Sequence, residues 1–252
     1  MELGGQLIRA VHLRPERVPA DERDRYPWSL AAVAALEQGI ELRSSVTFLV
    51  GDNGSGKSTV LEAIAVAAGM NPEGGSSNFS YATRTSHSAV GDALTLIRGA
   101  RRPRTDFFLR AESVFTAATY LEELPKAGGD PLEPYGGRSL HEQSHGESFL
   151  AIALNRLGPG GLYLLDEPEA ALSFPGQLAL LLRVDELART GAQWIIATHS
   201  PVLVAHPDAQ ILRCSDRGLV EIEYDEVPAV RDHRRFLDDP RRQIDLLLGD
   251  RD

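Results

Sequence analysis

The stretch GDNGSGKST, Gly51 to Thr59, decides the fold of this chain. A short apolar run, VTFLV (Val46 to Val50), precedes it, and the helix-forming run STVLEAIAVAAG (Ser58 to Gly69) follows it. A strand, a turn of the form G-x-x-x-x-G-K-[ST] and a helix together predict a loop whose backbone N–H groups wrap around phosphates. We expect Lys57 to reach the β- and γ-phosphates of a nucleotide and the Ser58 hydroxyl to bind Mg²⁺. The residues expected to hold the nucleotide are Asn53, Gly54, Ser55, Gly56, Lys57, Ser58 and Thr59.

Two further apolar runs end in polar side chains that suit catalysis. LYLL (Leu162 to Leu165) leads into Asp166 and Glu167, and QWIIATHS (Gln193 to Ser200) carries His199 near its end. Because open α/β sheets bind ligands at the carboxyl ends of their strands, these groups should lie beside the phosphate loop. We expect Asp166 to hold Mg²⁺, Glu167 to act as general base towards a water molecule, and His199 to donate to the γ-phosphate. The expected catalytic residues are Lys57, Glu167 and His199.

The stretch SHGES, Ser144 to Ser148, has two compatible interpretations. Ser144 followed by Glu147 forms a capping box, which begins a helix by satisfying its first backbone N–H groups. The N-terminus of a helix also favours an anion. The local sequence alone leaves both a helix cap and a phosphate site open.

Alternating strands and helices predict an α/β fold with a mainly parallel sheet flanked by helices. Segments 211–215 and 219–226 indicate a late pair of strands, and SLAAVAAL (Ser29 to Leu36) predicts a helix. Residues 71–91 are polar and rich in Gly and Ser, so we expect a mobile loop there. The C-terminal segment from Val230 predicts a helix that is interrupted near Pro240.

Length and composition favour one globular domain, 1–252. A single cysteine, Cys214, excludes a disulfide framework and fits a reducing compartment. No apolar run approaches the roughly 20 residues of a membrane span. The opening residues MELGGQLIRA lack the pattern of a secretory signal. We therefore expect a cytoplasmic protein without direct membrane insertion.

The net charge of −10 does not favour nucleic-acid binding, which usually shows as a basic face. Two arginine clusters, 101–104 and 231–235, could oppose this charge locally, although solvated surface is the simpler interpretation. Nucleic acid therefore stays open as a partner.

Four motifs in order, GDNGSGKS, SHGE, LYLLDEPE and THS, resemble the ATP-binding-cassette (ABC) class of P-loop ATPases. YGGRSLHEQSHGESF and DEPEAAL are most similar to the stand-alone bacterial AAA-family ATPases, which are built like ABC ATPases and are related to RecF, SMC and OLD-type proteins. The resemblance implies ATP and Mg²⁺ as cofactors, a small helical lobe at roughly 92–157, and a head-to-tail homodimer that encloses ATP. In such a dimer Ser144, Gly146 and Glu147 would face the γ-phosphate held by the other subunit.

The chain departs from the family pattern at several positions. The family signature L-S-G-G-Q is replaced by Gln143-Ser144-His145-Gly146-Glu147, in which His145 could contact the phosphate or only cap the helix. Arg110 or Glu112 stands nearest to the family's Q-loop glutamine. Tyr26 and Trp28 are both candidates for stacking on adenine.

The resemblance leaves three functions open. The first is a soluble ATPase that dimerises on ATP and drives or gates a separate effector protein or a nucleic-acid process. The second is the ATP-binding subunit of an ABC transporter, and the third is a slow nucleotide-dependent regulator. The missing glutamine near Arg110 and the absence of a long charged helix pair between Ser58 and Ser144 favour the first.

Overall fold

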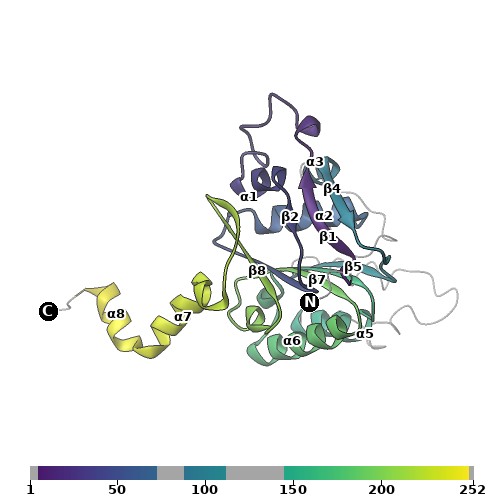
Figure 1. Ribbon diagram of the computed structural model, residues 1–252. Helices are drawn as coiled ribbons and strands as arrows, with labels where there is room; N and C mark the ends of the chain where they lie inside the picture. Colours follow the sequence, from purple (N-terminus) through teal and green to yellow (C-terminus); the bar gives the residue numbers. More distant parts are fainter. Residues whose placement is uncertain (1–4, 73–87, 112–144, 250–252) are drawn as a thin grey trace.

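The computed structural model describes residues 5–72, 88–111 and 145–249 (Figure 1). Its strands are β1 (Ile8–Leu13), β2 (Ile40–Glu41), β3 (Val46–Val50), β4 (Leu94–Arg98), β5 (Asp106–Arg110), β6 (Leu162–Asp166), β7 (Gln193–Ala197), β8 (Gln210–Ser215) and β9 (Gly218–Glu221). The larger sheet has the order β5-β6-β7-β3-β8-β9 and is parallel except for the last pair. The smaller sheet, β2-β1-β4, is antiparallel. The predicted α/β fold with a mainly parallel sheet and an antiparallel part is confirmed.

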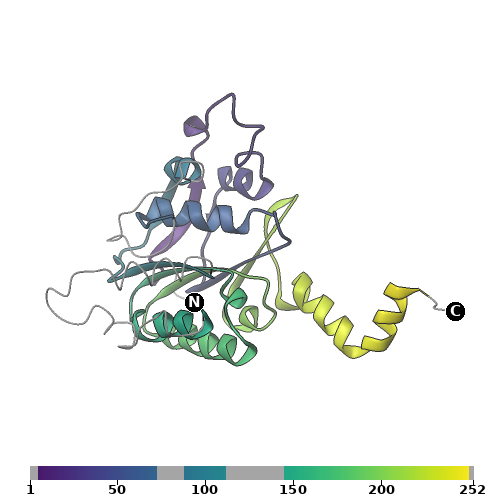
Figure 2. The same ribbon diagram turned by 180° about the vertical axis from the view of Figure 1, so that it is seen from behind.

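Helices cover both faces of the larger sheet. The described residues form the helices α1 (Ala31–Ala34), α2 (Lys57–Ala68), α3 (Ser88–Ala93), α5 (His145–Asn155), α6 (Phe174–Arg189), α7 (Pro228–Asp238) and α8 (Pro240–Leu248). Short 3₁₀ turns are η1 (Pro15–Arg17), η2 (Ala35–Glu37), η6 (Pro168–Ala170), η7 (Leu203–Ala205) and η8 (Tyr224–Glu226). Helices α5 and α6 lie on one face, whereas α2 and the smaller sheet lie on the other (Figures 1 and 2).

The central strands β3, β6 and β7 are buried along their whole length and mostly apolar, because they face a hydrophobic core on each side. Phe48 of β3 and Trp194 of β7 enter the core shared with α5 and α6. Their neighbours Leu49 and Ile195 enter the core shared with α2 and the smaller sheet. Successive side chains of a strand point to opposite faces, so a strand buried on both faces reads as a continuous apolar run.

A buried glutamine joins the two sheets. The side-chain oxygen of Gln193, at the start of β7, accepts hydrogen bonds from the backbone N–H groups of Leu7 and Ile8, both at 2.8 Å. Its amide nitrogen donates to the carbonyl oxygen of Ile8 at 2.8 Å. The smaller sheet is therefore held against the larger one by directed bonds as well as by apolar packing.

Helix α2 begins and ends at glycines, as the sequence predicts. Gly56 precedes the helix with φ +95°, and Gly69 closes it with φ +92° while its N–H bonds to the carbonyls of Ala65 and Val66. A left-handed glycine is a common helix terminator. The helix expected over 29–36 is shorter, since the α-helical part covers Ala31–Ala34 and then tightens into η2.

The expected loop over 71–91 is partly a helix. Residues 73–87 lie outside the described part of the chain, but α3 begins at Ser88. A Cβ atom on Gly91 would lie 2.5 Å from the Val66 side chain and 3.1 Å from the Ala63 carbonyl oxygen. The glycine is thus explained by the close approach of α3 to α2 rather than by a loop.

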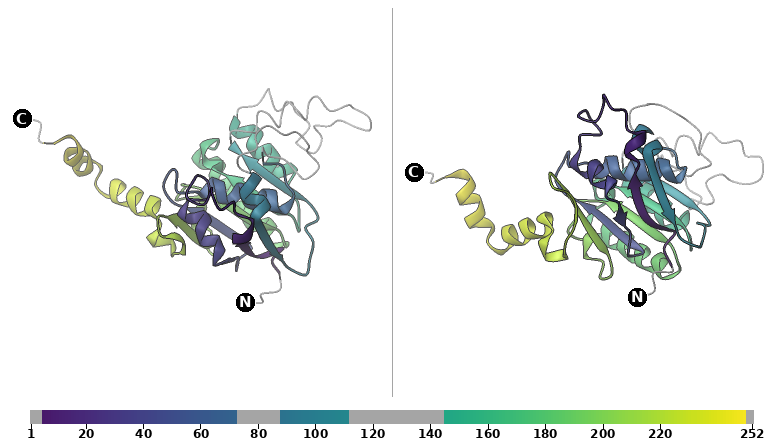
Figure 3. Two further views of the ribbon diagram at one scale, coloured as in Figure 1. Left: turned by 90° about the horizontal axis from the view of Figure 1, so that it is seen from above. Right: turned by 45° about the horizontal axis from the view of Figure 1, so that its top comes forward.

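The C-terminal helices α7 and α8 extend away from the body of the molecule (Figures 1 and 3). Val230 of α7 is buried in the core, and the hydroxyl of Tyr224 donates to the carbonyl of Pro201 at 3.2 Å, so the base of this arm is anchored. Further out, Leu237 and Leu247 are 70% and 78% exposed. Pro240 begins α8, which confirms the predicted interruption.

The predicted helical lobe at 92–157 lies partly outside the described residues. Strand β4 belongs to the smaller sheet, β5 belongs to the larger sheet and α5 is helical. Because 112–144 is not described, the helical lobe stays a prediction.

Among the described residues, no helix has the length and apolar character to cross a membrane.

Candidate functional site

The phosphate loop lies at the carboxyl end of β3 and leads directly into α2. Gly51, Gly54 and Gly56 have φ values of +146°, +77° and +95°, which favour glycine. At Gly51 space is limiting as well, because a Cβ atom would lie 2.3 Å from the carbonyl oxygen of Cys214 on β8. The backbone of the loop therefore has a shape that only glycines permit at these positions.

Lys57 is buried beneath this loop, with 3% of the residue exposed. Its Nζ donates to the carbonyl oxygens of Gly51 and Asp52, both at 3.0 Å. Burial lowers the pKa of Lys57 from its ordinary value, while the nearby charge of Glu167 opposes this shift. The ammonium group thus lies in a partly desolvated position, where its attraction for a phosphate is strong.

A pocket of about 350 Å³ opens above the loop. This volume lies in the range of small-molecule sites. The side-chain oxygen of Ser55 is buried, and no described residue forms a hydrogen bond with it, so a polar group remains available in the loop. The pocket is lined by Tyr26, Leu30, Asn53, Gly54, Gly56, Lys57, Ser58, Thr59 and Glu167.

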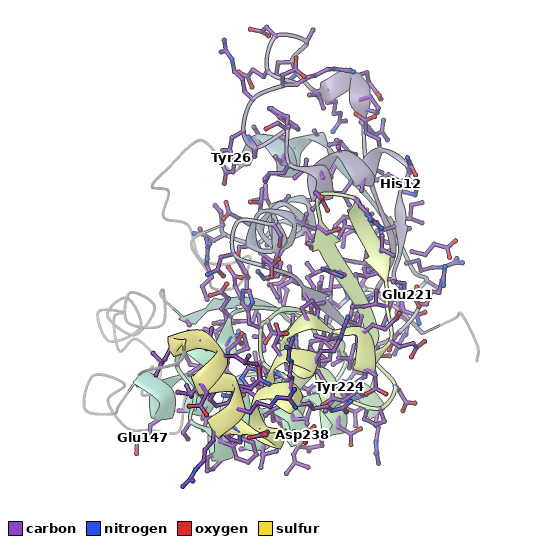
Figure 4. The ribbon with its side chains drawn as sticks, turned by 90° about the vertical axis from the view of Figure 1, so that its left-hand side faces the viewer. His12, Tyr26, Glu147, Glu221, Tyr224 and Asp238 are labelled. Atoms are coloured by element: carbon purple, nitrogen blue, oxygen red, sulfur yellow. The ribbon has the colours of Figure 1, made fainter. Side chains whose placement is uncertain are left out.

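The two aromatic candidates for stacking on adenine, Tyr26 and Trp28, have different surroundings. Trp28 is 5% exposed, belongs to the hydrophobic core beside α2, and donates from Nε1 to Glu22 at 3.2 Å. Tyr26 is 60% exposed and lines the pocket. Figure 4 shows Tyr26 at the edge of the molecule. Of the two, only Tyr26 is placed to contact a base.

The expected metal ligands lie next to one another. Ser58 Oγ donates to Asp166 Oδ1 at 2.9 Å, and the Asp166 side chain is 7% exposed. Burial raises the pKa of Asp166, and the positive charge of Arg110 opposes that shift. Among the described residues there is no cluster of three or more His, Cys, Asp or Glu side chains suited to a metal ion. One hydroxyl and one carboxylate fit Mg²⁺, which usually keeps several waters and binds substrate phosphates.

Glu167, the residue after β6, has an unusual backbone conformation. Its φ of +48° is the one positive value for a non-glycine residue among the described residues. Such a conformation costs about 1–3 kcal/mol and often occurs at functional sites. Its N–H donates to the carbonyl of Ala197 at 2.9 Å, and its side chain lines both the nucleotide pocket and a smaller pocket beside Asp166.

His199 faces Glu167 across the ends of β6 and β7. His199 Nε2 lies 3.6 Å from Glu167 Oε1. This nitrogen is buried, and the described residues provide no hydrogen-bond partner for it. A second pocket, of about 260 Å³, lies between His199, the start of the phosphate loop and the base of α7, where Asp232 and His233 contribute to its lining.

The sequence did not point to Glu169, which holds the turn after β7 that carries His199. Glu169 accepts hydrogen bonds from Thr198 Oγ1 at 2.7 Å and from the backbone N–H of His199. Ser200 adds a bond from its Oγ to Gln177 Oε1 on α6 at 2.6 Å. The second glutamate of DEPE was the available signal, but its partner Thr198 is 29 residues away in sequence.

Of the two candidates for the Q-loop position, Arg110 lies in the described part of the chain and Glu112 lies outside it. Arg110 is the last residue of β5 and is paired in register with Asp166. Its guanidinium group forms ion pairs with Asp166 and with Glu62 of α2. Arg110 is therefore a cation that touches an expected metal ligand.

The signature stretch begins a helix, as expected. Helix α5 starts at His145, and a Cβ atom on Gly146 would lie 2.6 Å from the carbonyl oxygen of Ala171. Glu147 is exposed and lies well apart from Tyr26 in Figure 4. Ser144 and the side chain of His145 lie outside the described residues, so the capping box and the role of His145 stay predictions.

Two protein-family models match the chain. One, described as "AAA domain", matches residues 34–110 and includes the phosphate loop. The other, described as "AAA domain, putative AbiEii toxin, Type IV TA system", matches residues 140–205 and includes Asp166, Glu167 and His199. These two matches support an AAA/ABC-type ATPase. The predicted resemblance is confirmed, and the phosphate loop, Asp166, Glu167 and His199 lie at one edge of the larger sheet.

Solved structures resemble this AAA/ABC-type chain at low similarity. The SMC head domain from Thermotoga maritima is 16% identical, with 73% of this chain and 93% of that chain covered and a TM-score of 0.41. An ATP-binding cassette of an ABC transporter in its ADP conformation is 18% identical, with 84% and 91% covered and a TM-score of 0.45. A dimeric ATP-binding cassette bound to ADP and Pi is 19% identical, with 74% and 88% covered and a TM-score of 0.43. Among curated proteins, none matches the chain. The assignment rests on the family models and the described topology.

Proposed function

We propose that this chain binds Mg²⁺ and ATP, hydrolyses ATP to ADP and phosphate, and forms a head-to-tail homodimer around the nucleotide. The observation that carries the proposal is the convergence of groups from three neighbouring strands on one sheet edge. Lys57 follows β3, Asp166 and Glu167 end β6, and His199 follows β7. A cationic phosphate partner, a metal ligand, a base and a hydrogen-bond donor are the parts that hydrolysis of a phosphoanhydride requires.

The residues have distinct roles in this proposal. Lys57 binds the β- and γ-phosphates. Ser58 and Asp166 would hold the metal ion, which would supply positive charge to the phosphates. Glu167 accepts a proton from a water molecule while the oxygen of that water molecule forms a bond to the γ-phosphorus. The bond from that phosphorus to the β,γ-bridging oxygen breaks, leaving ADP and phosphate. His199 donates a hydrogen bond to the γ-phosphate and keeps Glu167 in position.

The dimer is supported by the location of the signature stretch. Gly146 and Glu147 do not line the nucleotide pocket of their own chain, and Glu147 lies on the surface. The N-terminus of an eleven-residue helix such as α5 favours an anion. A second copy, placed head to tail, would bring this end to the γ-phosphate of the first.

The test uses variants that separate binding, hydrolysis and dimer formation. Glu167→Gln should bind ATP but not hydrolyse it, and should accumulate as an ATP-bound dimer in light scattering. Lys57→Ala should lose nucleotide binding. Ser144→Arg should bind ATP and remain monomeric, because its side chain would fill the space for the partner's phosphate. A Glu167→Gln protein that stays monomeric with saturating Mg·ATP would contradict the dimer, and undiminished affinity in Lys57→Ala would contradict the site.

We further propose a cytoplasmic ATPase that acts on a separate effector protein or a nucleic acid. The departure at Arg110 supports this choice over a transporter subunit, because the family's transporter coupling uses a neutral glutamine there. ATP turnover measured with and without DNA separates the two partner classes. Recovery of a multi-span membrane protein with the purified chain would instead favour the transporter role.

A further inference from the structure

Arg110 lies where two buried carboxylates approach one another. Its Nη1 is 2.9 Å from Glu62 Oε2 and 3.3 Å from the carbonyl oxygen of Pro72, and its Nη2 is 3.4 Å from Asp166 Oδ2. The Glu62 and Asp166 side chains are 5% and 7% exposed, whereas Arg110 is 27% exposed. Buried carboxylates require compensating charge, and this guanidinium group supplies it to both.

The two oxygens of Asp166 have different partners. Oδ1 accepts from Ser58, the other expected metal ligand, and Oδ2 faces Arg110. A pocket of about 140 Å³ lies beside this group and is lined by Ser58, Arg110, Asp166 and Glu167, together with Ala111 and Ala170. Arg110 therefore borders the space that a metal bound by Ser58 and Asp166 would enter.

We propose that Arg110 is a positioning residue that sets the metal affinity of Asp166, and that Glu62 controls how strongly it does so. The inference rests on the metal site of the proposed function. Arg110 pairs with Oδ2 of Asp166. When Asp166 serves as a metal ligand, Arg110 stays on Glu62 and Pro72, which keep the cation close without requiring Asp166. The pair Glu62 and Arg110 thus ties metal binding at β6 to helix α2.

The charges predict opposite effects for the two sides of this pair. Arg110→Gln removes a positive charge beside Asp166 and Glu62, so the site attracts a cation more strongly and metal binding should tighten. Glu62→Gln removes a negative charge beside Arg110, so the positive charge of Arg110 acts more strongly on Asp166 and metal binding should weaken. A change of one unit charge within several Å of a divalent ion should alter affinity by about tenfold or more.

The experiment measures Mn²⁺ binding by electron paramagnetic resonance in the presence of saturating ADP. Compared with the wild type, Arg110→Gln should bind Mn²⁺ about tenfold more tightly and Glu62→Gln about tenfold more weakly. Arg110→Lys, which keeps the charge, should remain nearer to the wild type. Arg43→Gln removes an exposed arginine that pairs with Glu41 and Glu221 outside the site, and should have no effect.

The double variant Glu62→Gln/Arg110→Gln guards against misfolding, because it removes one charge of each sign. Its Mn²⁺ affinity should fall between those of the single variants. If folded Arg110→Gln and the double variant both bind Mn²⁺ as the wild type does, or more weakly, Arg110 has no such role. If the wild type binds ADP but no Mn²⁺, the metal site and this inference both fail, whereas the first result leaves the proposed ATPase intact.

Discussion

Glu169 accepts a hydrogen bond from Thr198 Oγ1 at 2.7 Å, which joins the turn after β6 to the turn after β7. The same carboxylate accepts from the backbone N–H of His199. One acid therefore fixes the distance between the strand end that carries Glu167 and the turn that carries His199.

Substitution of Glu169 should slow hydrolysis without weakening nucleotide binding. Hydrogen bonds to a charged group contribute about 1.5–3 kcal/mol, so Glu169→Ala should lower kcat by roughly tenfold to a hundredfold. Because Glu169 does not line the nucleotide pocket, KM should change little. Steady-state kinetics separate the two effects. Glu186→Gln, which removes an exposed carboxylate of α6, should behave as the wild type.

Tyr26 should contribute to affinity through the base and not through the phosphates. Stacking of a base on an aromatic side chain is worth about 1–3 kcal/mol, so Tyr26→Ala should weaken ADP binding by roughly fivefold to a hundredfold. Tyr26→Phe should retain affinity. Inorganic tripolyphosphate, which lacks a base, should bind Tyr26→Ala and wild type equally. A matching loss with tripolyphosphate would contradict stacking.

Cys214 should react with thiol reagents only when the chain opens. It is 1% exposed, and burial raises its pKa to about 12, so the thiol stays protonated well above pH 9. At pH 8 the native protein should resist a chromogenic disulfide reagent and react fully in denaturant. ADP should slow the native reaction further, since Cys214 lies behind the phosphate loop. Rapid reaction of the native chain would be inconsistent with this burial.

His206 should make the protein less stable in mild acid. It is buried, with Nε2 3.6 Å from Asp185 Oδ1, and burial lowers its pKa below the ordinary value of 6.5. Below pH 6.5 the unfolded chain then binds the proton more readily than the folded one, so the free energy of unfolding falls until the folded pKa is passed.

Denaturation by urea at pH 7 and pH 5 measures this effect. His206→Asn should lose less stability over this interval than the wild type. His233→Asn, which removes an exposed histidine on α7, should keep the wild-type difference between the two pH values. Equal losses in His206→Asn and wild type would remove His206 as the cause.

The motifs predicted the strand ends well because the residues of each motif lie within one short segment of sequence. A phosphate loop needs its glycines, its lysine and the following helix within one short segment, and LYLLDE places two carboxylates at a strand end. Parallel pairing of β3, β6 and β7 then brings these ends together, with Asp166 opposite Ala197 in register. The sheet edge could therefore be inferred from the sequence.

Contacts between distant segments could not be inferred in the same way. Glu62 and Arg110 meet because α2 packs on β6 and β7, and β5 lies next to β6 in the sheet. The sequence around either residue gives no sign of the other. Tyr26 and Trp28 are two residues apart, yet one lines the pocket and the other fills the core. Gly91 resembled a loop signal, although it is required by close packing of α3 on α2.

The arm formed by α7 and α8 has a mechanical consequence. Its base at Pro228 and Ala229 borders the same pocket as His199, whereas its far end is free of the body (Figure 3). Helix α7 alone is about 16 Å long, so a rotation of roughly ten degrees at its base would displace its far end by about 3 Å. With this geometry, a small angular change beside His199 would produce a larger displacement at the exposed leucines of α8.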